Sequence, residues 1–147
     1  MATRKKAIEH VAEVFPSYDY ENSDVCREYL LNALQLLTVD QDDSAEAKHR
    51  LLRKVGQSLN RDHRIKEAVI LLEESCQWAA RNLPDDHPDR LASQHELALV
   101  YVANGQVMEA VELLEHNVTV YKQLLTEDHL LRQISEFELA AAKQMNR

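Results

Sequence analysis

The chain has 147 residues, 45% of them hydrophobic and 29% charged, and a formal net charge of −8. Affinity for nucleic acid rests on clustered Lys and Arg, so this acidic balance argues against a nucleic-acid partner. No apolar run is long enough for a membrane span, and the N-terminal residues lack the apolar stretch of a secretory signal. Cys26 and Cys76 form neither a metal-ligand motif nor a disulfide framework. We therefore expect a cytoplasmic protein without a membrane or nucleic-acid partner.

Strong helix formers fill the chain, which contains only two glycines and three prolines. This composition predicts an all-α protein, and it excludes the glycine-rich loops that bind nucleotide phosphates. Apolar residues recur at steps of three and four, most clearly from Val107 to Leu125, and Asn104-Gly105 marks a turn. The pattern predicts seven helices, at about 5–14, 24–37, 44–60, 65–82, 89–103, 107–125 and 130–145.

The sequence repeats itself with a period of 42 residues. Glu67-Ala68-Val69 matches Glu109-Ala110-Val111, and Leu83-Pro84-Asp85-Asp86-His87 matches Leu125-Thr126-Glu127-Asp128-His129. A third copy begins at Arg132 and contains one helix. A fixed period that carries two helices is typical of an α-solenoid built from helical hairpins.

Small residues occupy the positions where the two helices of each hairpin would cross. The first copy has Val55-Gly56-x-x-Leu59 with Ala68-x-x-x-Leu72, and the second has Leu97-Ala98-x-x-Tyr101 with Ala110-x-x-x-Leu114. This pattern resembles the tetratricopeptide (TPR) repeat, although Leu52, Gln94 and Glu136 replace the family's Trp. The resemblance implies one domain, a right-handed α-solenoid. Its parts would be a divergent helix pair with a long connecting loop at 1–38, TPR hairpins at 44–84 and 88–126, and a capping helix at 130–147.

The long period resembles the kinesin light chain type of TPR. The stretches 87–98 and 104–116, with the segment 15–30 before them, are similar to the repeat region of fungal NOD-like receptors. In those receptors an NB-ARC or NACHT nucleotide-binding switch precedes the repeats. The resemblance implies a sensing or scaffold part of such a protein. Kinesin cargo adaptation is less favoured, because no heptad segment for pairing with a motor chain is present.

In TPR arrays one wall of each hairpin's first helix faces a concave groove. Matching the copies predicts a groove that is basic at one end and apolar at the other. We expect it to bind a protein or peptide, with its basic end attracting acidic groups, although the basic residues could also form an ordinary solvated face. The predicted groove residues are Arg50, Arg53, Lys54, Gln57, Asn60, His95, Leu99, Val102, Ile134, Phe137 and Ala141.

The histidines and the incomplete third copy bear on two other functions, catalysis and self-assembly. His87 and His129 recur with the repeat at an inter-hairpin turn, which favours a structural role, and no His-Glu-x-x-His motif occurs. We therefore predict no enzyme activity and no catalytic, cofactor or metal site. The alternative function is self-assembly, in which Ile134, Phe137 and Leu139 of the incomplete third copy form a homo-oligomer contact.

Overall fold

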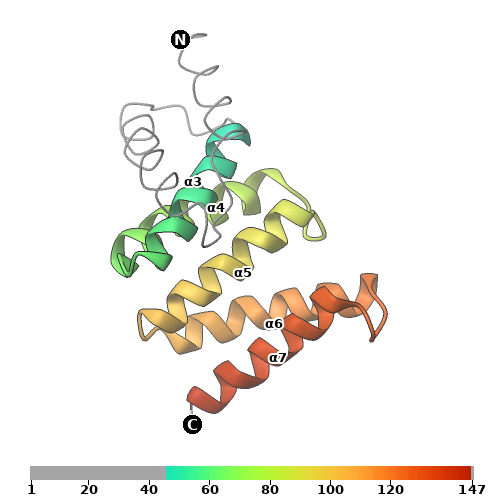
Figure 1. Ribbon diagram of the computed structural model, residues 1–147. Coiled ribbons are helices and arrows are strands. Elements are labelled where there is room, and N and C mark those ends of the chain that lie inside the picture. Colours follow the sequence, from blue (N-terminus) through green and yellow to red (C-terminus); the bar gives the residue numbers. More distant parts are fainter. Residues whose placement is uncertain (1–45, 147) are drawn as a thin grey trace, which may run out of the picture. The chain divides into compact units, whose positions relative to one another are not determined.

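The structure, a computed structural model, describes residues 46–146, and all secondary structure within them is helical (Figure 1). This confirms the all-α class. The structure describes five helices rather than seven, because the predicted helices at 5–14 and 24–37 lie outside the described residues, as does Cys26. The five begin and end within two residues of their predicted limits: α3 (Glu46–Arg61), α4 (Ile65–Asn82), α5 (Pro88–Ala103), α6 (Val107–Leu124) and α7 (Leu130–Met145).

The chain divides into two compact units, Met1–Trp78 and Ala79–Arg147. In the first unit, α3 packs closely against α4. A Cβ atom added at Gly56 of α3 would lie 2.6 Å from Cγ of Leu72 on α4, which is closer than real Cβ contacts. Because Gly56 has no side chain, α3 can approach α4 closely at Leu72, and any larger residue at position 56 would keep the two helices apart. Leu51, Val55 and Leu59 of α3 are fully buried.

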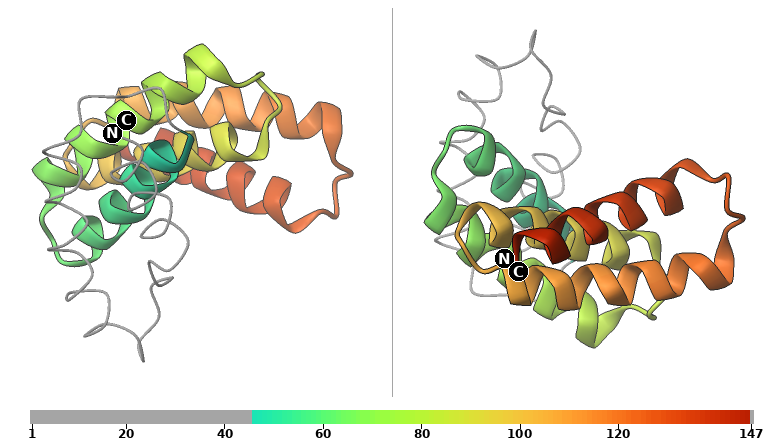
Figure 2. Two further views of the ribbon diagram at one scale, coloured as in Figure 1. Left: turned by 90° about the horizontal axis from the view of Figure 1, so that it is seen from above. Right: turned by 90° about the horizontal axis from the view of Figure 1, so that it is seen from below.

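The second unit is a layer of three neighbouring helices in which α6 lies alongside both α5 and α7 (Figures 1 and 2). One core cluster of this unit consists of three alanines and a leucine: Ala98 of α5, Ala110 and Leu114 of α6, and Ala142 of α7 are all at most 2% exposed. Small side chains let helix axes come close, so backbone atoms join the van der Waals contact. Tyr101, Val102, Val111, Leu113 and Leu139 pack around this cluster.

The two inter-hairpin turns end in the same cap. Nδ1 of His87 accepts a hydrogen bond from the Asp89 backbone N–H at 3.1 Å, and Nδ1 of His129 accepts one from the Leu131 N–H at 3.2 Å. Each histidine thus satisfies a backbone donor that the first turn of a helix leaves free. The structural role predicted for both is confirmed. The predicted turn after α5 is also present, with Gly105 at φ +81°.

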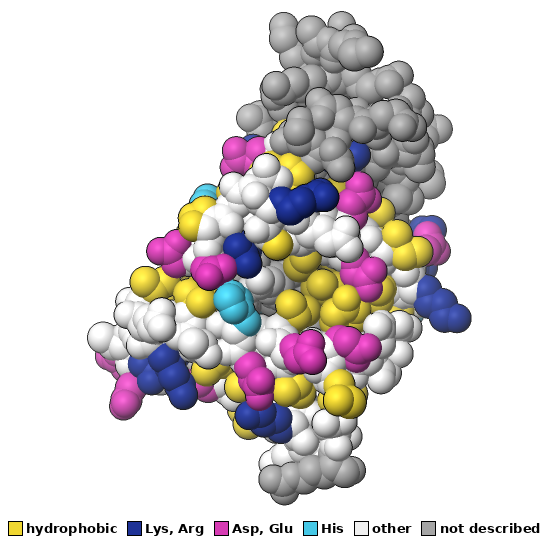
Figure 3. All heavy atoms as spheres, turned by 180° about the vertical axis from the view of Figure 1, so that it is seen from behind, with side chains coloured by type: hydrophobic (Ala, Val, Ile, Leu, Met, Phe, Trp, Pro, Cys, Tyr) yellow, Lys and Arg dark blue, Asp and Glu magenta, His cyan; other side chains and the backbone are white. Residues whose placement is uncertain are grey.

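Several large apolar side chains reach the surface, and Figure 3 shows hydrophobic side chains among acidic ones on one face of the molecule. Phe137 of α7 is 75% exposed, Leu130 66% and Met145 59%. None of the helices in the described part is both long and apolar enough to cross a membrane. Exposed apolar groups of this size on one helix mark it as a candidate contact surface.

Candidate functional site

A pocket of about 390 Å³ opens between α5, the last turn of α6 and the first turns of α7 in the second unit. Its size is in the range of sites that hold a small ligand or a few side chains. The lining is mainly apolar, with polar groups of Asp86, Glu96 and His95 among it. The apolar residues of the lining are Pro88, Leu91, Ala92, Tyr121, Leu124, Leu125, Leu131 and Ile134.

A histidine–carboxylate pair joins α5 to α7 beside this pocket. Nδ1 of His95 lies 3.0 Å from Oε2 of Glu138, and both side chains are about three-quarters buried. The hydrogen bond to Glu138 raises the pKa of His95; burial opposes this, and the charges of Glu138 and Glu96 add to it. A protonated His95 therefore strengthens the contact between the two helices.

The structure brings together only some of the predicted apolar groove residues. His95 and Ile134 line the pocket, whereas Val102 packs against the small-residue core between α5 and α6. Phe137 and Ala141 are exposed on α7 outside the pocket lining, and Leu99 is half-buried. The pocket thus includes only two of the predicted groove residues. Its lining also includes Tyr121 and Leu124 of α6, which the repeat pattern did not indicate.

The basic residues lie together on α3 in the first unit. Arg50 is exposed, and Arg53 and Lys54 are half-buried, as are Gln57 and Asn60 along the same helix. Burial lowers the pKa of Lys54, and the positive charges of Arg53 and Arg50 lower it further. The three cations therefore lie close enough together for their charges to interact.

One buried polar contact recurs in both hairpins and was not anticipated. The Ser75 hydroxyl of α4 donates to the His49 carbonyl of α3 at 3.2 Å, and the Asn117 amide of α6 donates to the Leu91 carbonyl of α5 at 3.0 Å. The repeat could have indicated this contact, since Ser75 and Asn117 are 42 residues apart, which is one repeat period. Asn117 is fully buried, so its Asn-Val-Thr sequence is no accessible glycosylation site.

His49 and Ser75 resemble a catalytic base and its hydroxyl nucleophile, with Nδ1 and Oγ 2.8 Å apart. Both are at most 1% exposed, and the His49 ring also stacks on Trp78 with ring centroids 4.7 Å apart. A nucleophile must reach its substrate, so this buried pair holds α3 against α4 instead. Within residues 46–146 no three His, Cys, Asp or Glu side chains gather as a metal site would require.

The His95–Glu138 contact predicts a pH-dependent stability. Because the pKa of His95 is raised in the folded chain, its contribution is complete below the unfolded value of 6.5 and is lost as pH rises through the folded pKa. Glu138→Gln is expected to lower the free energy of urea unfolding by about 1 kcal/mol at pH 6, and by clearly less at pH 8.5. Glu136→Gln is the matched control, because Glu136 pairs with Arg132, whose charge is constant over this range. Equal losses for Glu138→Gln at both pH values would contradict this role of His95.

Known proteins of three kinds resemble the chain. Residues 43–123 match the model of the tetratricopeptide repeat family. A crystal structure of a kinesin light chain protein of Podospora anserina with nearly identical TPR-like repeats superposes with a TM-score of 0.79. That match has 31% identity and covers 99% of this chain and 68% of that one, and a substituted form of the same protein matches equally.

A nucleotide-binding leucine-rich repeat (NLR)-like protein of Hyaloscypha variabilis is 30% identical over 91 residues. The match covers 60% of this chain but only 9% of that protein. These findings confirm the predicted resemblance to kinesin light chain-like TPR repeats and to an NLR-like relative. The chain belongs to the tetratricopeptide repeat family.

Proposed function

We propose that the chain is a non-enzymatic module that binds a protein or peptide partner, and that the pocket between α5, α6 and α7 holds part of that partner. TPR repeats are in general protein-interaction modules, which supports the class of function. The observation that carries the location is the largely apolar 390 Å³ pocket, which includes the predicted groove residues His95 and Ile134.

The chemistry of the pocket favours one or two apolar side chains of an extended or helical segment. Leu124 is 53% exposed, Leu131 51% and Ile134 39%, so a partner can cover apolar surface that is now in water. Burial raises the pKa of the Tyr121 hydroxyl, which agrees with apolar surroundings at the pocket wall. Burying one Leu or Phe side chain there would contribute about 1.5–3 kcal/mol to binding.

Filling the pocket should weaken this binding. Ala92 lines the pocket and is only half-buried, so Ala92→Trp places an indole in the space that the partner would use. We expect at least tenfold weaker binding, by isothermal titration calorimetry, of peptides selected on the parent chain from a random library. Ala103→Trp is the control, because Ala103 is exposed at the end of the same helix and outside the pocket. Unchanged affinity of Ala92→Trp would rule out the pocket.

We propose further that the basic face of α3 attracts acidic groups of a partner. Arg50, Arg53 and Lys54 lie within five residues of one helix, so one acidic group of a partner could contact more than one of them. Arginine is also the side chain that best matches carboxylate and phosphate geometry.

The double substitution Arg50→Glu with Arg53→Glu is expected to weaken binding of acidic peptides about tenfold at low salt, and the difference should shrink at high salt. Fluorescence anisotropy with labelled Glu-rich peptides would measure it. Lys66→Glu with Arg81→Glu changes charge equally at two exposed positions of α4 and serves as the control. If both double variants bind alike, the α3 residues are an ordinary solvated face.

We infer a receptor context from the NLR-like relative: this module would be the sensing or scaffold part of a fungal NOD-like-receptor-type protein in the cytoplasm. The net charge of −8 supports a protein partner over nucleic acid in that setting. The support for this role is the likeness of the repeats, which the relative shares over 91 residues.

Self-assembly is the second candidate, and the exposed stripe of α7 supports it. Leu130, Ile134, Phe137 and Met145 follow one another at helical spacing, so they share one face of α7, and all four are exposed. A stripe of this kind on a second copy could cover it.

Light scattering after size exclusion, over a hundredfold range of concentration, tests this candidate. Self-assembly predicts a mass above 16.9 kDa that grows with concentration, and Phe137→Glu should return it to the monomer. Phe137 is 75% exposed, so this substitution leaves the fold intact. A constant monomer mass for the parent would exclude self-assembly through this face.

A further inference from the structure

The contact between α5 and α6 shows which features of the first helix of a hairpin the second helix packs against. α6 covers Ala98 of α5, which has 0% exposure, with Ala110 and Leu114. One turn away the buried Asn117 amide donates to the Leu91 carbonyl. The first hairpin shows the same two elements, Gly56 against Leu72 and Ser75 against the His49 carbonyl.

α7 carries the same features as α5, and in the described part of the chain no helix covers them. Its counterpart of Ala98 is Ala140, 42 residues later, and Ala140 is exposed. Its counterpart of the Leu91 carbonyl is the carbonyl of Gln133. α7 packs on α6 through the buried Ala142, with Leu139 beside it, whereas Ala140 is exposed on another side of the helix.

The start of α7 repeats the start of α5 in its bonds as well. Nη1 of Arg90 donates to the Leu83 carbonyl, and Nη1 of Arg132 donates to the Leu125 carbonyl, both at 3.0 Å. The first of these sites also has a contact from α6, because Nε2 of His116 lies 4.0 Å from Asp85, the ion-pair partner of Arg90. At the start of α7 the counterpart of Asp85 is Glu127, and the side chain of Glu127 is exposed.

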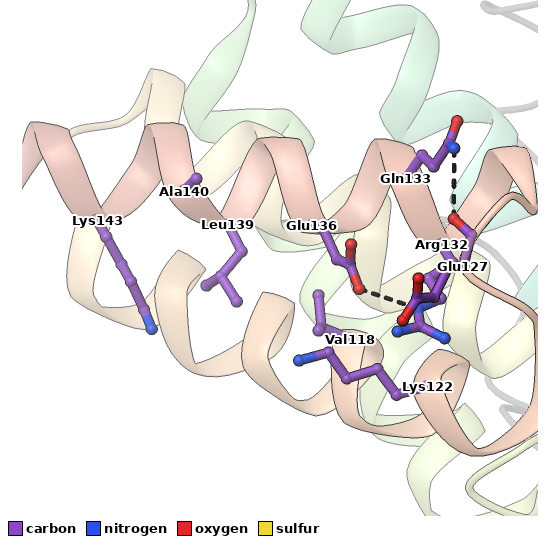
Figure 4. Close-up of a pocket in the computed structure, with 9 residues that line it drawn as sticks. All are labelled: Val118, Lys122, Glu127, Arg132, Gln133, Glu136, Leu139, Ala140 and Lys143. Carbon is purple, nitrogen blue, oxygen red and sulfur yellow. Dashed lines mark hydrogen bonds and ion pairs between the residues drawn. The ribbon is translucent and has the colours of Figure 1, made fainter.

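These features line an open cleft of about 630 Å³ between α6 and α7, shown in Figure 4. Leu139 of α7 and Val118 of α6 point toward each other across it. Charged groups of both signs surround them, with Glu136 bonded to Arg132 and the Gln133 amide donating to the Glu127 carbonyl. The lining residues are Val118, Lys122, Glu127, Arg132, Gln133, Glu136, Leu139, Ala140 and Lys143.

We propose that this cleft binds an amphipathic helix of a partner protein, and that the helix carries the contact pattern of α6. The pattern is a small residue at the crossing point, a leucine four positions later and an amide or hydroxyl side chain three positions after that, as in Ala110, Leu114 and Asn117. The small residue would cross on Ala140, and the polar side chain would donate to the Gln133 carbonyl. The exposed Lys122 at the edge favours acidic residues on the flank of the helix, as α6 itself has at Glu112, whereas Lys143 is already paired with Glu115 of α6 at 3.2 Å.

This surface is distinct from the pocket of the proposed function. The pocket is lined by Ile134 and Ser135 of α7, whereas the cleft is lined by Glu136, Leu139 and Ala140 of the same helix. The two share no lining residue, so binding at one can be removed without touching the other.

The probe is a peptide of residues 107–124 with a hydrocarbon link between positions 119 and 123, which are exposed in α6. The link holds the short peptide as a helix, because isolated helices of this length are marginal in water. We expect saturable binding to the intact chain in fluorescence anisotropy. The same peptide with Leu114→Glu should bind at least tenfold more weakly.

Two matched variants of the chain locate the site. Ala140→Arg places a long charged side chain at the crossing point, and it should weaken peptide binding at least tenfold. Ala141→Arg makes the same change one residue on, about 100° around the helix, and should leave binding unchanged. Both alanines are exposed, so both variants are expected to keep the parent circular dichroism and melting temperature.

Three outcomes would overturn the proposal. One is no saturable binding up to about 1 mM peptide, an affinity too weak for a specific site. Another is an equal effect of Ala140→Arg and Ala141→Arg, which would place the peptide elsewhere. The third is self-association of the chain that Ala140→Arg abolishes while the peptide fails to bind, which would assign the cleft to a second copy.

Discussion

The close crossing of paired helices on a small residue is the constraint on which the described structure depends. Gly56 leaves no room for even a Cβ atom opposite Leu72, and Ala98 meets Ala110 with neither exposed to water. At such a distance backbone and side-chain atoms of both helices gain dispersion contact over the length of the crossing. A larger residue at either point would separate the helices and open the core of its hairpin.

The buried polar contact beside each crossing fixes which residues meet. Apolar surfaces of two helices can slide by a turn at modest cost. A buried amide or hydroxyl that misses its acceptor, however, costs the full free energy of its desolvation. Ser75 and Asn117 each have a carbonyl of the first helix as acceptor. The register of each hairpin is therefore set, and the same polar contact recurs 42 residues later within the second hairpin.

The sequence predicted the helices of residues 46–146 to within two residues at each end, because apolar spacing and turn residues are local signals. The pocket was predicted only in part. His95 of α5 and Ile134 of α7 both line it, whereas Val102, expected beside them, packs against the core cluster. The direction in which Val102 points was predicted from an ideal repeat. Val102 is the penultimate residue of α5, where the repeat pattern is a poor guide to that direction. The His95–Glu138 pair joins different helices, so its distance depends on how α5 and α7 are offset, and no local pattern encodes this.

The positions of residues around α7 also explain how this helix can contribute to two binding surfaces, the pocket and the cleft, that differ in selectivity. Ile134 belongs to the pocket, where any apolar side chain of suitable size gains from burial. Ala140 belongs to the cleft, where a partner must bring a helix whose small and polar residues keep the spacing found in α6. A side-chain pocket tolerates varied sequences, whereas a helix crossing with a buried polar contact rejects most of them, because a wrong register leaves polar groups unpaired. The cleft is therefore the more selective of the two surfaces.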